Sequence, residues 1–208
     1  MRTRMFIILL TGFWCGNLNA QTAVEPKKEK WIAHNSTASF GEDGVIHVTN
    51  TSEKSALLWV KDTDFINGTV ELDIKGKDVR GESFVGIAFH GADNDYYDGV
   101  YFRPFNFRSP DRKDHSVQYI DKPASDWQVL RETFPGKYEN HLHPVPDPND
   151  WFHAKIVINF PSVEVYVNGA KEPSLRVEQI SLRKSGKLGL WIDGKDGWFK
   201  NVVITNSN

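Results

Sequence analysis

From Trp31 to its end, the chain is a succession of short β-like segments, each interrupted by Gly, Asp, Asn or Pro. The segment 68–75 shows the pattern: Val70, Leu72 and Ile74 alternate with polar residues, as in a half-buried strand. Outside the first 20 residues, no stretch of helical length has an apolar period of 3.6 residues. This succession, with turn residues at short intervals, predicts an all-β fold, an antiparallel sandwich or a barrel.

The predicted strands are 45–49, 56–60, 68–75, 84–90, 99–103, 116–120, 128–132, 153–159, 163–167, 187–193 and 198–205. An Asp/Asn/Gly loop separates 84–90 from 99–103, as in a hairpin. The interval 122–150 holds five prolines, which cannot donate to a sheet ladder, so we expect a largely ordered loop inserted into the sandwich.

The first 20 residues have the order of a secretory signal peptide. A basic start at Arg2 and Arg4 precedes a short apolar run, and Ala20 offers a small residue for cleavage. An uncleaved anchor is the alternative, although the apolar run is short for a membrane span. We therefore expect a secreted, periplasmic or cell-surface protein, with a flexible lead-in at 21–30 and a single β-sandwich domain at 31–208.

Composition and net charge limit the classes of binding partner that we expect. The net charge of −2 gives no electrostatic case for nucleic acid or an anionic membrane surface, and the mature chain is expected to have no membrane span. Cys15 is the only cysteine and lies in the predicted signal peptide, so no disulfide is expected in the mature chain. The 7 Trp, 6 Tyr and 13 Phe suit either core packing or stacking on sugar rings.

Alternation divides the predicted strands 84–90, 99–103 and 187–193 into two sides. One side carries large apolar residues, which we assign to the core. The other combines small residues with rings and hydrogen-bonding groups: Gly86, Ala88, Gly99 and Gly189 with His90, Tyr101, Arg103, Trp191 and Asp193. Because small residues weaken strands unless something must come close, we predict an open face that binds carbohydrate. The alternative is that the loop 122–150 covers Tyr101 and Trp191 as a second small core.

The resulting binding hypothesis gives each side chain a role. Trp191 and Tyr101 would stack on sugar rings, while Arg103, His90 and Asp193 would orient hydroxyl groups. Loop residues complete the predicted ligand-binding set, with Trp127 or Tyr138 as a clamp and His143 beside them.

Evidence for catalysis is weaker. Paired carboxylates would be required for glycoside hydrolysis, and Glu132 and Asp193 are the candidates. The strand 71–76 resembles the Glu-x-Asp-x-x-Glu strand of family-16 glycoside hydrolases, but Gly76 replaces the last acid, so Glu71 and Asp73 are interpreted as solvated strand residues.

No metal or cofactor is expected. His141 and His143, joined by His90 or His115, would suit zinc, but satisfied loop histidines are the preferred interpretation. The segment 194–197 is interpreted as a turn, with a calcium site as the alternative.

The C-terminal segments 151–158, 163–169, 186–191 and 198–204 resemble the closing strands of the concanavalin A-like lectin/glucanase superfamily. Their tryptophan-led strand, Val-Asn-Gly hairpin, Gly-x-Leu-Gly-Leu strand and final Phe-x-Asn-Val strand are most similar to laminin-G-like and 3-keto-disaccharide hydrolase (domain of unknown function 1080) proteins. The resemblance implies a two-sheet antiparallel jelly-roll sandwich whose concave face holds glycan. It implies no particular catalytic residue, because these apolar motifs build the fold.

Three functions follow as hypotheses. The preferred one is a secreted carbohydrate-binding protein that holds an oligosaccharide or polysaccharide on the concave face. The first alternative is a glycoside hydrolase of family-16-like or 3-keto-disaccharide hydrolase type that uses carboxylates at the rim of that face. The second is an adhesion module whose aromatic face binds protein.

Overall fold

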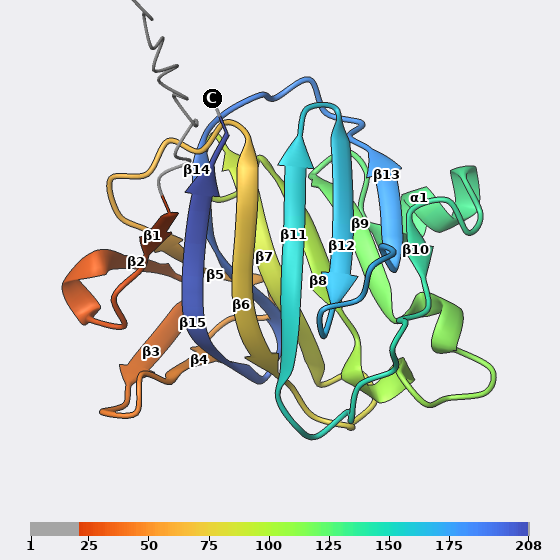
Figure 1. Ribbon diagram of the computed structural model, residues 1–208, viewed down its shortest axis with the longest axis horizontal. Helices are drawn as coiled ribbons and strands as arrows, with labels where there is room; N and C mark the ends of the chain where they lie inside the picture. The colour runs from red at the N-terminus through yellow and green to blue at the C-terminus, as the bar shows by residue number, and fades with distance from the viewer. Residues whose placement is uncertain (1–20, 208) are drawn as a thin grey trace, which may run out of the picture.

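The computed structural model describes residues 21–207, so the predicted signal peptide lies outside the described residues. Two antiparallel sheets pack face to face in a jelly-roll sandwich, which confirms the predicted fold class (Figure 1). The eight-stranded sheet has the order β13-β12-β11-β6-β15-β4-β3, with β1 paired to β15. Its strands are β1 (Gln21–Ala23), β3 (Ser36–Phe40), β4 (Ile46–Asn50), β6 (Gly68–Lys75), β11 (Phe152–Asn159), β12 (Ser162–Val167), β13 (Leu175–Glu178) and β15 (Asp196–Asn206).

The seven-stranded sheet has the order β10-β9-β8-β7-β14-β5-β2. Its strands are β2 (Trp31–His34), β5 (Ala56–Val60), β7 (Ser83–Gly91), β8 (Tyr97–Phe102), β9 (Val117–Lys122), β10 (Glu139–Asn140) and β14 (Lys187–Gly194). One α-helix, α1 (Trp127–Thr133), lies beside β9 and β10 at one edge of the sandwich (Figure 1). Single 3₁₀ turns cover Lys28–Lys30, Pro104–Asn106 and Lys113–His115.

The core lies between the two sheets and is built by alternation. On β6, Val70, Leu72 and Ile74 are buried, whereas the residues between them are partly exposed, as the sequence predicts. On the facing sheet, Val85 and Ile87 of β7 point into the same core. Burial of this kind, at roughly 25 cal/mol per Å² of apolar surface, is the main stabilising term of a chain without a disulfide in its described part.

Every predicted strand except 128–132 overlaps an observed strand, and the predicted hairpin is the β7–β8 pair. The segment 128–132 belongs instead to α1, so that prediction is wrong. The reason is local: the Asp126 carboxylate accepts hydrogen bonds from the backbone N–H groups of Gln128 (3.1 Å) and Val129 (3.3 Å). This N-cap satisfies the first free donors of a helix and makes a two-turn helix the better choice.

Two other expectations change. Residues 21–30 were expected to be loose, but β1 pairs with β15, and the Trp31 indole donates to the Glu25 carbonyl oxygen over 3.0 Å. Within the interval 122–150, α1 and β10 replace part of the expected loop. Across residues 21–207, no helix is long and apolar enough to cross a membrane.

Candidate functional site

The outer face of the seven-stranded sheet, the side turned away from the other sheet, carries the predicted aromatic pair. The register aligns Trp191 of β14 and Tyr101 of β8 with Gly86 of β7 between them. Their ring centroids are 4.7 Å apart. A Cβ atom on Gly86 would lie 2.6 Å from the Tyr101 Cα atom, so only glycine fits. Gly86 therefore lets the strand of Tyr101 approach closely, and Gly189 lies against Trp59 in the same way, whereas Gly99 lies against the Ile120 side chain. That these small residues make room for a ligand stays a prediction.

The same rings are recessed rather than openly exposed. Tyr101 is 2% exposed and Trp191 is 4% exposed, which supports the alternative of a second small core. The covering is incomplete, because a cavity of about 320 Å³ remains over the rings. This aromatic cavity is lined by Tyr101, Trp191, Phe84 and Trp127, with polar groups from Asp193 and Lys122. Trp127 is the exposed member, and α1 positions it.

Hydrogen bonds fix the polar groups around the aromatic cavity. One Asp193 carboxylate oxygen accepts from the Ser55 hydroxyl (3.1 Å) and the other from the Gly194 N–H (2.8 Å). The Trp191 indole donates to the Tyr97 hydroxyl (3.0 Å), and Arg103 donates to the Tyr101 hydroxyl (2.5 Å). Burial raises the pKa of Tyr101 well above its ordinary value, so this hydroxyl stays protonated and keeps a proton to donate.

A second cavity, of about 240 Å³, shares Phe84 and Trp127 with the first. Its wall carries Arg80, Arg103, Arg112, Arg131 and His115, and we call it the arginine cavity. Trp127 stands between the two cavities, with the guanidinium groups of Arg131 and Arg103 at 4.9 Å and 5.8 Å from its ring centroid. Such cation–π contacts hold an exposed indole in one orientation.

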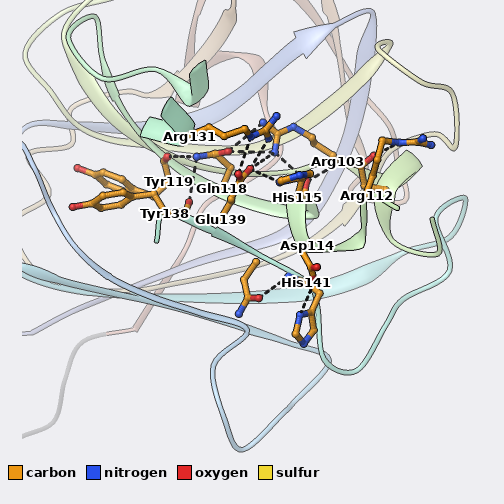
Figure 2. Close-up of polar contacts among 12 residues, drawn as sticks. Arg103, Arg112, Asp114, His115, Gln118, Tyr119, Arg131, Tyr138, Glu139 and His141 are labelled. Carbon is orange, nitrogen blue, oxygen red and sulfur yellow. Dashed lines mark hydrogen bonds and ion pairs between the residues drawn. The ribbon is translucent and has the colours of Figure 1, made fainter. Parts of the chain in front are cut away.

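One buried carboxylate organises the arginine cavity (Figure 2). Glu139 of β10 accepts from Arg131 Nε at 2.8 Å and Nη2 at 2.5 Å. His115 Nδ1 lies 2.9 Å away, and Arg103 Nη1 lies 3.8 Å away. Burial works to raise the pKa of Glu139, but the hydrogen bonds and charge of Arg131, with those of His115, outweigh it and lower the pKa. Glu139 is therefore ionised at neutral pH.

Two further cavities continue along the same face. One, of about 370 Å³, shares Ser55, Lys122 and Asp193 with the aromatic cavity. The next, of about 440 Å³, shares His34 and Asn94 with the third. Because neighbouring cavities share lining residues, the four cavities adjoin in a row across the outer face of the seven-stranded sheet, and we call this row the groove.

The structure brings together some of the predicted site residues. Tyr101, Trp191, Asp193 and Trp127 line the aromatic cavity, and Arg103 lines the arginine cavity. Their role in ligand binding remains a prediction. Glu139 and Arg131, which organise the site, were not among the candidates, because nothing in their local sequence distinguishes them from solvated charges.

Four predicted residues lie elsewhere. His90 is completely buried, with Nε2 2.6 Å from the Ile66 carbonyl oxygen. Its left-handed backbone (φ 48°) breaks the alternation on which its placement on the open face depended. Tyr138 is buried against Tyr119, so it is not an exposed clamp. His143 and Glu132 are exposed, and neither lines any of the four cavities.

The structure also shows where the residues of the alternative metal site and of the alternative acidic strand lie. His141 pairs with Asp114 (3.2 Å) rather than with other histidines, and residues 21–207 contain no group of three candidate metal ligands. Asp196, in the segment 194–197, receives two hydrogen bonds from Lys77. The carboxylates of Glu71 and Asp73 face outward on the other sheet. They lie 3.3 Å and 2.9 Å from the His153 ring nitrogens, on a different sheet from the groove.

Comparison with known proteins defines the class. Residues 21–205 match the model of the 3-keto-alpha-glucoside-1,2-lyase-like domain, and the chain belongs to this family. Among solved structures, it is similar to the carbohydrate-binding module CBM66 of Bacillus subtilis (16% identity, 85% of this chain and 96% of that chain covered, TM-score 0.62). It is also similar to the beta-glucanase of Bacillus licheniformis (13% identity, 94% and 96% covered, TM-score 0.52). At these identities the structural likenesses show the fold. The search of curated proteins found no match.

The Glu139 cluster gives a prediction for stability. Glu139→Gln should lower the free energy of unfolding by about 3 kcal/mol near neutral pH, because it leaves the buried Arg103 and the partly buried Arg131 and His115 without their carboxylate. Since the folded-state pKa is lowered, this contribution is complete above the ordinary value of 4.5 and is lost as the pH falls through the folded pKa. Urea unfolding at about pH 7 and about pH 3 measures both effects.

The matched control is Glu132→Gln, an exposed residue of α1, which should change stability by less than about 0.5 kcal/mol. The interpretation fails if the difference between wild type and Glu139→Gln is the same at both pH values.

Proposed function

We propose that this protein binds carbohydrate in the groove on the outer face of the seven-stranded sheet. The observation that carries the proposal is the aromatic cavity, in which Tyr101 and Trp191 face the space beside Trp127. A sugar ring has apolar C–H faces that pack on such rings and hydroxyl groups at its edge that need polar partners. The Asp193 carboxylate and the Tyr101 hydroxyl supply an acceptor and a donor at fixed positions.

The recessed rings favour a small-ring ligand over a protein partner. A protein-binding adhesion surface requires a contiguous exposed apolar patch, whereas Tyr101 and Trp191 are almost completely covered at the cavity floor. The family and the fold of the similar structures, which include a carbohydrate-binding module and a beta-glucanase, support the same class of ligand. Residues 1–20 support secretion to the periplasm, the medium or the cell surface, where such ligands occur.

Trp127→Ala tests the binding site without disturbing the core, because Trp127 is 39% exposed. The variant should weaken oligosaccharide binding by about tenfold or more, through loss of one wall of the aromatic cavity. Isothermal titration with a panel of neutral oligosaccharides measures the affinity, and urea unfolding checks that the fold is retained.

Phe134→Ala is the matched control, because Phe134 is an equally exposed ring directly after α1 that lines none of the four cavities. It should leave binding unchanged. Equal affinities for wild type and Trp127→Ala would exclude the aromatic cavity as the binding site.

Cleavage of a 3-keto glucoside is the second candidate function, and the family match favours it. In a 3-keto sugar the C2 proton is acidic, because the ketone stabilises the resulting negative charge. A base takes this proton, the C–H electron pair forms the C1=C2 double bond, and the glycosidic oxygen leaves with the C1–O pair and takes up a proton. We propose Asp193 as the base, since its carboxylate lies in the aromatic cavity.

A hydrolytic alternative needs a second carboxylate for the acid role. Asp126 also lines the aromatic cavity, but one of its oxygens accepts two backbone hydrogen bonds as the cap of α1. Glu132, the other sequence candidate, is exposed and lines none of the four cavities. The structure therefore favours a role for Asp193 alone over a paired-carboxylate mechanism.

Asp193→Asn tests this second function. With a 3-keto disaccharide as substrate, the rate of cleavage followed by mass spectrometry should fall about 100-fold, a much larger loss than the loss of affinity. The control is Asp111→Asn, an exposed residue outside the four cavities, which should leave the rate unchanged. Undiminished cleavage by Asp193→Asn would remove Asp193 from the mechanism.

A further inference from the structure

The arginine cavity has an excess of positive charge that neutral sugar binding does not require. Four arginines and one histidine line it, and none of its lining residues is an aspartate or a glutamate. They come from separate parts of the chain: Arg80 precedes β7, Arg103 follows β8, Arg112 and His115 lie before β9, and Arg131 is in α1. Figure 2 shows the labelled Arg103, His115 and Arg131 converging on Glu139.

Glu139 does not neutralise this excess. Its carboxylate is engaged by the fork of Arg131 and by His115, and it lies 3.8 Å from Arg103. Arg112 donates to the Asn106 side-chain oxygen (3.2 Å), which is neutral. Among residues 21–207, neither Arg80 nor Arg112 forms an ion pair with a carboxylate. One carboxylate is therefore set against four guanidinium groups.

Guanidinium groups gathered in a partly enclosed space repel one another, and a bound anion relieves that repulsion. The planar fork of each group matches the paired oxygens of a carboxylate or a sulfate ester. Phe84, Phe105 and Trp127 line the same cavity, so the space combines anion-binding groups with surfaces for an apolar ring face. An anionic group carried on a sugar ring meets both requirements, whereas a free inorganic anion would leave the rings unused.

We propose that the arginine cavity binds a negatively charged sugar residue, a uronate or a sulfate ester, while its neutral neighbour occupies the aromatic cavity on the other side of Trp127. This inference rests on the proposed carbohydrate-binding function and names the class of glycan. Arg80 and Arg112, which have no carboxylate partner within the described chain, are the groups that distinguish a charged ligand from a neutral one.

The test uses three disaccharides that have the same two sugar rings and the same linkage and differ only at C6 of one ring. They are the neutral compound, the 6-uronate and the 6-sulfate. Isothermal titration at about 0.05 M and about 0.15 M salt should show at least one anionic form binding about tenfold more tightly than the neutral one, with the advantage smaller at the higher salt. The anionic disaccharide that binds more tightly identifies which anionic group the arginine cavity prefers. In Arg80→Gln/Arg112→Gln the ratio of the anionic to the neutral affinity, both measured on the same variant, should fall below about threefold.

Arg108→Gln/Arg176→Gln is the matched control, because it removes two positive charges from exposed residues that lie outside the four cavities. It should retain the full preference for the anion. Loss of the preference in this control, or its persistence in Arg80→Gln/Arg112→Gln, would overturn the assignment to the arginine cavity.

The remaining outcomes separate the two proposals. Equal affinity for the neutral and both anionic disaccharides, lost in Trp127→Ala, overturns the charged-glycan inference and leaves the proposed function intact. An absence of binding to all three, together with no binding across the neutral panel, overturns both.

Discussion

The site depends on the buried carboxylate of Glu139. By holding Arg131, it secures α1 against the edge of the seven-stranded sheet, and α1 in turn places Trp127 over the face where Tyr101 and Trp191 pack. The same carboxylate lies beside His115 and Arg103, so the two cavities on either side of Trp127 share one electrostatic anchor. Without that anchor, the face would be an aromatic layer with no defined wall, and the cationic groups around it would repel one another.

Much of the fold was predictable because it depends on local periodicity. The predicted bounds of 56–60 and 68–75 coincide with β5 and β6, because β5 is a continuous apolar run and β6 alternates strictly between buried and partly exposed residues. The elements that were missed, such as β1 and β10, are three and two residues long and exist only through their partners. The helix α1 was missed because a segment of seven residues has too little periodicity to identify, although the Asp126 cap before it was a usable signal.

The site was predictable in part for the same reason. Alternation correctly placed Tyr101 and Trp191 on one face, because both lie within regular strands. It misplaced His90, whose left-handed backbone breaks the strand pattern. The arginine cavity could not be predicted from the sequence, because its charged residues come from four separate segments that only the tertiary fold brings together. The close approach expected at the small residues is present, but the groups nearest to Gly86, Gly99 and Gly189 are backbone and side-chain atoms of neighbouring strands.

The most direct measurement of the central claim is a two-dimensional nitrogen–proton NMR titration that follows the tryptophan indole signals as an oligosaccharide is added. Trp127 and Trp191 lie in the proposed groove, whereas Trp151 and Trp198 lie with Lys75 on the other sheet. The account predicts that the signals of Trp127 and Trp191 shift with a common dissociation constant, and that those of Trp151 and Trp198 do not. Shifts confined to Trp151 and Trp198 would place the ligand on the opposite sheet and contradict it.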